Sequence, residues 1–402
     1  MEIESLSNIS NVLAVPDNSS DEFIHFEIPP DCQSSQISVI YLFTYLTDEA
    51  LSVLFYATFE KILITAVFPI VFITGFIGNV AFLLVLGLFK EMRTTTNIYL
   101  GNLAVADLLF IVLTATSYYA SYISSFGLVS TKFYRTSFGC GCLFSMIYLS
   151  YFASICLMTL VGFERYLAIC FPLKHRMVSS TKRTLVLVVS TWMVSMGFAA
   201  LVAPSSGRLT KKCVIWPERE RYEDLPNVLH SCAAVHPIFN DIFGIAQAIP
   251  FTAALIINTV FYVMIIHRLN ARGQNGGDAG KSRINRINKV RNQVARMLII
   301  NGVIFFFCLA PFQFLNLLSV IIRHGGKSIL TSQQHSSLLW GSRCTSILNS
   351  AINPFVYSAT NPRYRKAFLE FFRCAICKPV RKGTTTPIFS VTDTKAQEES
   401  QI

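Results

Sequence analysis

The chain has 402 residues, of which 52% are hydrophobic and only 14% are charged, and its mean hydropathy is +0.48. Because soluble domains carry roughly 25% charged residues, this composition excludes an ordinary soluble domain and indicates a membrane protein. The formal net charge is +11, yet residues 1–59 contain nine acidic residues and neither Lys nor Arg. This uneven distribution indicates membrane topology rather than nucleic-acid binding.

Residues 1–60 are polar and acidic, and we expect them to form an extracellular, glycosylated N-terminal segment. Asn8-Ile9-Ser10 and Asn18-Ser19-Ser20 match the Asn-x-Ser acceptor pattern, so Asn8 and Asn18 are predicted glycosylation sites. No cleavable signal peptide is visible, so the first membrane helix is expected to direct targeting.

Seven apolar segments follow, and each is long enough to cross a membrane as a helix. They lie near residues 62–88, 98–122, 137–170, 185–204, 237–266, 290–321 and 334–358. The loops after the first, third and fifth segments are rich in Lys and Arg, so they are predicted to be cytoplasmic and the N-terminus extracellular. The sequence therefore predicts an all-α membrane protein, with a seven-transmembrane helix bundle over residues 61–360.

A short amphipathic helix is predicted directly after the bundle, at residues 361–377. Its aromatic residues fall on one face: Tyr364, Phe368, Phe371 and Phe372. That pattern is typical of a helix lying in the membrane interface. Cys374 and Cys377 at its end carry palmitate in one interpretation and stay unmodified in the other. Residues 378–402 are polar and rich in Ser and Thr, and they are predicted to form a disordered cytoplasmic tail.

The third segment begins near a cysteine, Cys140, and ends on the charged residues Glu164-Arg165 followed by Tyr166. A helix of this length climbs about 37 Å, so Cys140 lies at one membrane face and the charged pair at the other. Such a pair is costly unless it is used or reaches water by snorkelling. We find that this part of the chain resembles the third transmembrane helix of rhodopsin-class (class A) G-protein-coupled receptors, over the stretch CGCLFSMIYLSYFASICLMTLVGFERYLAICFP. The resemblance favours a functional role for the charged pair over snorkelling. We expect Glu164 to hold Arg165 in the resting state.

A carboxylate inside the second segment, Asp107, indicates a functional site by its depth alone. Its candidate partners are Asn79, Ser154, Asn349 and Asn353. Their oxygen atoms suit a hard cation, and the resemblance implies an allosteric Na⁺ site formed by Asp107, Ser154, Asn349 and Asn353. The alternative is a buried polar network that only joins helices. No other cofactor is expected.

Two proline motifs extend the resemblance. Asn353-Pro354 followed by Tyr357 matches the NPxxY motif of these receptors, and FFFCLAPFQ around Pro311 matches their sixth-helix motif. Leu309 stands where they usually have Trp, and Asn258 where they usually have Tyr. These departures concern the switching residues of the family and not its fold.

The resemblance also implies a disulfide bond from Cys140 to the loop before the fifth helix. Cys232 is the predicted partner, while Cys213 and the neighbouring Cys142 remain alternatives. The sequence contains no HExxH, GxSxG or Walker motif, so we do not expect an enzyme.

Within the class, the sequence is similar to peptide receptors of the thyrotropin-releasing-hormone and neuromedin U type. The similarity rests on IYLSYF, ERYLAICFPLKHR and RCTSILNSAINPFVYSATNPRYRKAF. Ile147 replaces the acidic residue with which amine receptors bind an ammonium group. The resemblance implies that Tyr148, Phe312 and Arg343 face the ligand. For Arg343 the alternative is a residue near the interface that reaches water.

The function implied by the resemblance is that of a plasma-membrane receptor. It would bind an extracellular neuropeptide and activate a heterotrimeric G protein of the Gq class, with calcium mobilisation. The implied coupling residues are Glu164, Arg165, Tyr166, Leu173 and Tyr357. Arrestin and receptor kinases are expected to bind the Ser/Thr-rich tail, lipids to surround the helices, and no nucleic acid to bind. The alternatives are a receptor for a non-peptide small molecule and, from another class, a secondary transporter or channel; we find no internal repeat of the transporter kind.

Overall fold

The computed structural model describes the chain from residue 54 to residue 377, except for residues 131–135, 218–221, 275–281, 326 and 328–329. Before residue 54 it describes residues 2–4, 12–16, 23–27, 29–32 and 37–42. The predicted glycosylation sites Asn8 and Asn18, the tail 378–402, and the side chains of Cys374 and Cys377 lie outside what is described, so these predictions stand as they were made.

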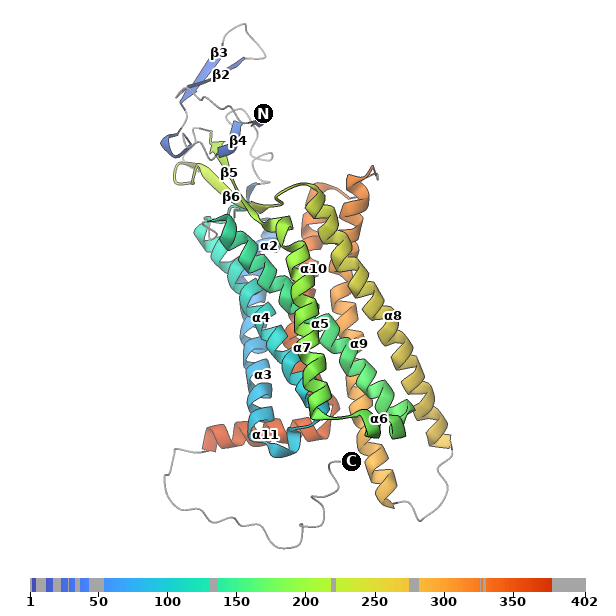
Figure 1. Ribbon diagram of the computed structural model, residues 1–402. Coiled ribbons are helices and arrows are strands. Elements are labelled where there is room, and N and C mark those ends of the chain that lie inside the picture. Colours follow the sequence, from blue (N-terminus) through green and yellow to red (C-terminus); the bar gives the residue numbers. More distant parts are fainter. Residues whose placement is uncertain are drawn as a thin grey trace.

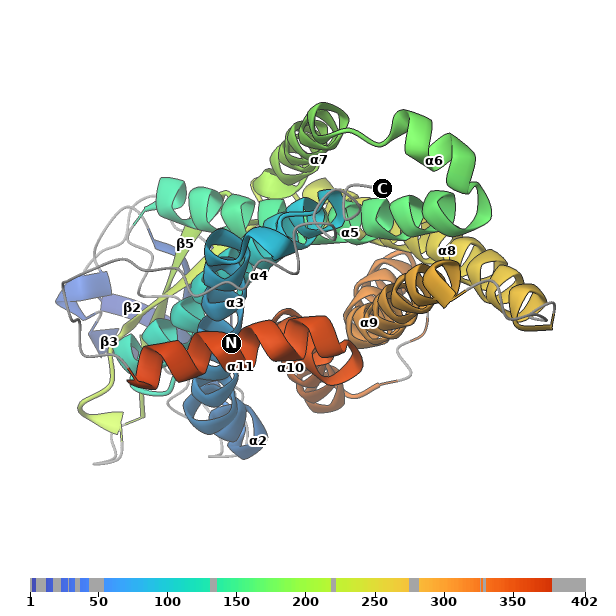
Figure 2. The same ribbon diagram turned by 90° about the horizontal axis from the view of Figure 1, so that it is seen from below.

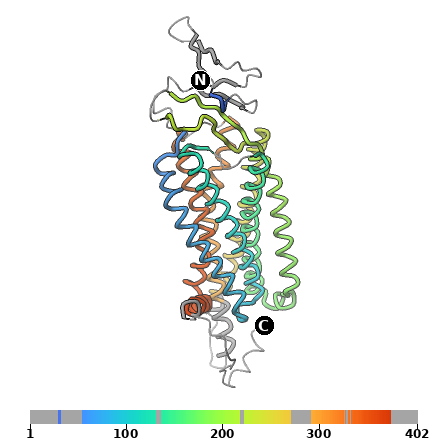
Figure 3. The backbone as a smooth tube through the Cα atoms, turned by 90° about the vertical axis from the view of Figure 1, so that its left-hand side faces the viewer, coloured from blue at the N-terminus to red at the C-terminus, as the bar shows by residue number. Residues whose placement is uncertain are grey.

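Seven long helices lie side by side as a bundle (Figures 1 and 3). The first consists of α2 (Thr58–Ile62), a π-helical turn η3 (Leu63–Val67) and α3 (Phe68–Leu88). The others are α4 (Thr95–Ser124), α5 (Ser137–Cys170), α7 (Thr181–Val202), α8 (Ile238–Gln274), α9 (Ser282–Arg323) and α10 (Ser332–Thr360). The predicted seven-helix bundle is confirmed.

Six of these helices are long and apolar enough to cross a membrane, within the part of the chain that the structure describes. The seventh, α10, is more polar, because its outer half reads SQQHSSLLWGSRCTS. It nevertheless packs along α9, α3 and α4. Large apolar side chains on the outer faces of the bundle are exposed, among them Ile70, Val186 and Phe307. A hydrocarbon environment suits such surfaces.

Side-chain caps set the start of several helices. Thr136 Oγ1 accepts a hydrogen bond from the Gly139 N–H at the start of α5, and Ser180 does the same for Arg183 at α7. Such caps satisfy N–H groups that have no partner within the helix. α5 tilts through the middle of the bundle, where it packs against α4, α7, α8 and α9 (Figure 1).

A small β-sheet covers the outer end of the bundle (Figure 1). Its strand order is β1 (Glu2–Glu4), β4 (Ile37–Leu42), β5 (Arg208–Ile215) and β6 (Val228–Ala233), and β4 runs parallel to β5. A separate hairpin joins β2 (Val12–Pro16) to β3 (Phe23–Glu27). The N-terminal segment therefore contributes short strands to this outer layer. Its strand β4 lies between β1 of the same segment and β5 of the loop before α8.

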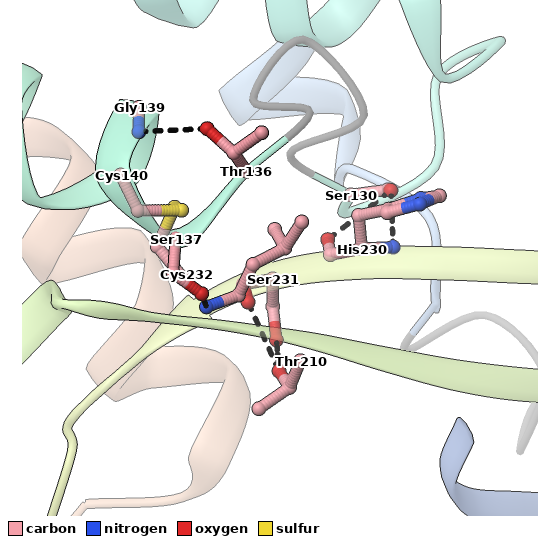
Figure 4. The surroundings of a disulfide bond; sticks show 10 residues. Ser130, Thr136, Ser137, Gly139, Cys140, Thr210, His230, Ser231 and Cys232 are labelled. Carbon is pink, nitrogen blue, oxygen red and sulfur yellow. Dashed lines mark hydrogen bonds between the residues drawn. A yellow bond between two sulfur atoms is a disulfide. The ribbon is translucent and has the colours of Figure 1, made fainter. Parts of the chain in front are cut away.

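Two disulfide bonds hold this outer layer. Cys140 at the start of α5 pairs with Cys232 in β6 (Figure 4), the partner chosen from the sequence. Cys213 in β5 pairs instead with Cys32 of the N-terminal segment, across 181 residues of sequence. The loop hairpin is thereby tied on one strand to the bundle and on the other to the N-terminal segment.

The outer layer has an apolar cluster of its own. It comprises Leu128, Val214, Trp216, Tyr222 and Leu229, with Leu54, Phe55 and Leu225 packed against them. The Trp216 and Tyr222 rings stack at 5.7 Å with an interplanar angle of 3°. Backbone bonds from Tyr56 N to Gly127 O and from Val129 N to Leu54 O join the segment before α2 to the α4–α5 connection. Three connections thus pack as one unit.

Two short helices lie at the opposite, cytoplasmic end. α6 (Pro172–Val178) follows α5, and α11 (Pro362–Cys377) crosses the base of the bundle beneath α3 and α10 (Figure 2). Tyr364 and Phe368 of α11 stack on Phe82 of α3, at 6.1 Å and 6.3 Å between ring centroids. The apolar face of α11 is therefore fixed to the helices, while Leu369 and Phe372 remain exposed.

Candidate functional site

The outer half of the bundle brings Tyr148 of α5 and Arg343 of α10 into one region. The Tyr148 ring lies edge-on to Phe243 of α8, with 5.0 Å between centroids. The Arg343 guanidinium lies over the Trp340 ring at 4.9 Å and over the Tyr118 ring at 5.6 Å. Arg343 also interacts electrostatically with Tyr148. The structure therefore places two of the three predicted ligand residues close together.

The charge of Arg343 has no acidic partner in the described part of the chain. Its guanidinium is half-buried and makes no hydrogen bond there, so the aromatic rings beneath it are its main support. A cation over an aromatic face is stabilised by about 0.5–1 kcal/mol at exposed sites and by more when desolvated. That contact leaves the N–H donors in the guanidinium plane available to a ligand.

Phe312, the third predicted ligand residue, is half-buried on α9. Within the described chain its ring makes no ring contact with Tyr148 or Trp340. Its assignment to the ligand stays a prediction.

The sequence analysis missed a set of side-chain amides between α5, α8 and α9. Gln313 Nε2 donates to the Tyr151 hydroxyl and to Gln247 Oε1, the latter at 3.3 Å. Asn316 Nδ2 donates to the same Gln247 oxygen at 3.4 Å. Gln247 and Gln313 are buried. The sequence did contain a signal for this set, because three carboxamide side chains lie in segments that are otherwise apolar enough to span a membrane. Polar side chains within a membrane span usually have a functional or structural role.

Asp107 of α4 is fully buried at mid-bundle. Ser154 Oγ donates to one carboxylate oxygen at 3.5 Å, and Asn353 Nδ2 donates to the other at 2.6 Å. Asn349 Oδ1 is buried and has no hydrogen-bond partner among the residues that the structure describes. Asn79 does not bond to Asp107, because its Nδ2 donates to backbone oxygens, including that of Ser350 at 3.0 Å.

This arrangement fits a small hard cation. The described residues provide Asp107 with neutral donors but no ion pair, so the charge of an ionised carboxylate would remain uncompensated. A buried charge without a counter-charge is strongly unfavourable. The orphaned oxygen of Asn349, together with the carboxylate and the Ser154 hydroxyl, forms an oxygen donor set of the kind that hard cations prefer.

The cytoplasmic end of α5 differs from the expected direct pair. Glu164 is buried and bonds to His175 Nε2 of α6 at 2.8 Å, and Arg183 Nη1 of α7 lies 3.7 Å away. Arg165 instead donates to the Thr96 hydroxyl of α4. Adjacent residues of a helix project about 100° apart, so Glu164 and Arg165 face different neighbours. The expectation that Glu164 directly holds Arg165 is wrong for this structure; the two charges interact only at longer range.

The other predicted coupling residues occupy the same end of the bundle. Leu173 on α6 is 80% exposed and free to contact a protein partner. Tyr166 stacks on Phe261 of α8, with ring centroids 5.0 Å apart. Tyr357 of α10 is buried against Phe82, and its hydroxyl lies near the Asn301 amide of α9. In α11, burial raises the pKa of Tyr364 to about 12, so its phenol stays protonated and donates to Asn97.

The two departures from the family pattern have visible consequences. Leu309 is buried in the same apolar cluster as Phe305. Asn258 of α8 donates to Thr159 Oγ1 of α5 at 3.0 Å. Four residues later, Tyr262 reaches the backbone of α9 at Gly302, where a Cβ would lie 1.9 Å from the phenol oxygen. The contact between α8 and α9 at this level therefore depends on a glycine.

Comparison with known proteins agrees with this arrangement. The family described as 7 transmembrane receptor (rhodopsin family) matches residues 78–357. Neuromedin-U receptor 2 of Homo sapiens is 28% identical over 312 residues, which cover 76% of this chain and 70% of that protein. The thyrotropin-releasing hormone receptor of Bos taurus is 27% identical over 347 residues and 77% of each chain. A neuromedin U receptor homologue of Caenorhabditis elegans is 27% identical over 322 residues, 75% of this chain and 77% of that protein. The chain belongs to the rhodopsin family of seven-transmembrane, G-protein-coupled receptors, and it is a multi-pass membrane protein of the cell surface rather than an enzyme.

Proposed function

We propose that this receptor binds an extracellular neuropeptide in the outer half of its bundle and activates a heterotrimeric G protein of the Gq class. Two of the relatives reported above are named as receptors for a peptide hormone or for neuromedin U, at 27–28% identity. The Gq assignment rests on this resemblance alone.

The assignment of a peptide ligand rests mainly on the charge of Arg343, which is unpaired as far as the structure describes the chain. Its guanidinium is supported by two aromatic rings and has no acidic partner in the described chain. A planar guanidinium presents several N–H donors in a fixed geometry, which suits peptide carbonyls or a carboxylate. Ile147, the residue directly before Tyr148 on α5, is apolar, so this position offers no anion for a monoamine. A peptide therefore fits better than the small-molecule alternative.

Activation in this proposal is a population shift. The peptide binds better to a conformation in which the cytoplasmic end of α9 has moved outward. That movement opens a cavity at the base of the bundle, where Arg165 contacts the G protein and the exposed Leu173 packs against it. Tyr166 and Tyr357 lie beside this cavity and adjust as it opens. Arrestin and receptor kinases would act on the same face through the tail.

Sodium would oppose this shift. Asp107, Ser154, Asn349 and Asn353 would hold the ion, whose charge offsets that of the buried carboxylate. If the ion binds the resting conformation better, linkage requires that it lower the affinity for an activating peptide.

The test is a neuropeptide library applied to cells that express the receptor, with intracellular calcium as the readout. At least one peptide should raise calcium with wild type. The same peptide should still bind the Arg165→Ala variant while producing no signal. A library that is inactive as a whole, on cells that respond to a non-peptide transmitter through this receptor, would contradict the peptide assignment.

A further inference from the structure

Two glutamines deep in the outer half of the bundle carry unsatisfied polar atoms that no part of the mechanism above uses. Gln247 of α8 is 0% exposed and Gln313 of α9 is 3% exposed. Within the described chain, Gln247 Nε2 and Gln313 Oε1 are closed off from solvent and have no hydrogen-bond partner within 3.5 Å, although the Tyr148 hydroxyl lies beside Gln247. Buried polar groups nearly always find partners, so two orphaned atoms in contacting side chains need an explanation.

The orphaned atoms form a complementary pair, one donor and one acceptor. This does not depend on how each amide is oriented. Exchanging the nitrogen and oxygen in both glutamines, and in Asn316 with them, keeps the bond of 3.3 Å between the glutamines with its donor reversed and again leaves one donor and one acceptor free. Exchanging them in only one side chain would bring two like atoms together, which the contact does not allow.

The surroundings fix the position of this pair. The Tyr151 hydroxyl and the Asn316 amide hold the bonded side of Gln313 and Gln247 respectively. Tyr148 lies next to Gln247 and interacts electrostatically with Arg343. The free side of the pair is therefore continuous with the region proposed to bind the ligand.

We propose that Gln247 and Gln313 form an amide-recognition subsite, in which Gln313 accepts a hydrogen bond from a ligand N–H and Gln247 donates one to the adjoining ligand carbonyl. The chemical class that supplies both groups together is a carboxamide, either within a peptide main chain or at an amidated C-terminus. This inference rests on the proposed peptide function and deepens it. Arg343 then binds one part of the ligand, and the glutamine pair forms hydrogen bonds with one amide group in another part.

Occupation of the subsite requires movement. The orphaned atoms are closed off from solvent, so a ligand reaches them only when Tyr148 changes its side-chain conformation or α8 and α9 separate at their outer ends. Asp241 of α8 bonds to Arg323 at 2.9 Å and to His324 at 3.1 Å at those ends. Satisfying the two glutamines would thus favour a bundle in which α8 and α9 have shifted relative to each other, which couples ligand chemistry to helix movement.

The test combines receptor variants with amide-to-ester analogues of the most potent peptide from the calcium screen. Each main-chain N–H is replaced in turn by an ester oxygen, and a terminal carboxamide by a methyl ester. One analogue should lose about tenfold or more in potency at wild type, because a buried acceptor is left unsatisfied. In Gln313→Met the same replacement should cost less than about threefold, because the acceptor for the ligand N–H is already absent. Gln247→Met removes the donor to the ligand carbonyl instead, so it should lower the potency of the parent peptide and leave the ester penalty in place. If the sensitive analogue carries an ester within the chain, the subsite binds a main-chain amide. If it carries the terminal methyl ester, the subsite binds the C-terminal carboxamide.

Asn301→Leu serves as the matched control. Asn301 is a buried amide on the same helix whose polar atoms have no hydrogen-bond partner within 3.5 Å in the described chain. It lies beside Tyr357, about 18 Å closer to the cytoplasm than Gln313. The ratio of ester to parent potency should equal that of wild type in this variant. If the ratio of ester to parent potency in Gln313→Met equals the wild-type ratio at every position, while Arg343→Ala still impairs the parent peptide, the subsite is refuted and the peptide function stands. If no peptide acts on wild type, both are refuted.

Discussion

Replacing Arg343 by alanine removes the guanidinium that the structure holds over Trp340 and Tyr118. The ring contacts exist without ligand, so their loss largely cancels between free and bound receptor. What remains is the loss of charge-assisted hydrogen bonds to the peptide, each about 1.5–3 kcal/mol. One or two such bonds correspond to a potency loss from about tenfold to several-hundred-fold or more.

The assay is the agonist dose–response of calcium release in cells matched for surface receptor. Arg343→Lys should recover only part of the potency, since an ammonium group keeps the charge but lacks the planar arrangement of donors. Arg323→Ala is the control for loss of an outer arginine: its charge is already neutralised by Asp241 at 2.9 Å, and breaking that link between α8 and α9 should not lower agonist potency. Activation of Arg343→Ala at wild-type concentrations, or an equal loss in Arg323→Ala, would refute the reasoning.

Four further outcomes are expected. Asp107→Asn should abolish the lowering of agonist affinity by Na⁺, measured by radioligand displacement with and without sodium. An unchanged sodium effect would mean that Asp107 belongs only to a structural polar network. Glu164→Gln should raise agonist-free signalling severalfold, because the anchor of α5 to α6 and α7 loses its charge; unaltered basal nucleotide exchange would argue against that role. Leu309→Trp should change maximal response more than surface expression, since a larger ring must fit a buried site, and an unchanged response would show that this position takes no part in switching. Cys32→Ser should speed protease cleavage before α2 on intact cells, and equal cleavage would mean that the outer apolar cluster suffices to hold the segment.

The helices could be predicted because each rests on local evidence. Apolar runs of about 20 residues leave few alternatives in a bilayer, and charged loops orient them. α10 was predicted despite its polar outer half, because Asn353, Pro354 and Tyr357 form a recognisable motif. The same motif and Asp107 pointed to one polar centre, which the structure assembles.

The outer sheet could not be predicted, since its strands are distant in sequence. β4 pairs with β5 across roughly 170 residues, and the disulfide between Cys32 and Cys213 that secures this pairing has no sequence signature beyond two cysteines. The partner of Glu164 was missed for a related reason. It depends on how α6 and α7 fold back onto α5 to present His175 and Arg183.

The amide pair shows a third limit. Gln247 and Gln313 each look unremarkable in an apolar segment, and only the packing of α8 against α9 brings them together. A sequence therefore shows that polar side chains lie within predicted membrane spans, but only a structure shows which of them contact each other between neighbouring helices.

The central claim, ligand-dependent activation of a G protein, is tested most directly with purified receptor in lipid nanodiscs and a purified Gq heterotrimer. The most potent peptide from the screen is titrated while guanine-nucleotide exchange on the α subunit is followed. The account predicts a saturable acceleration of exchange that Arg165→Ala abolishes while peptide binding persists. Saturable peptide binding with no acceleration of exchange on Gq, or the same acceleration with Arg165→Ala, would contradict it.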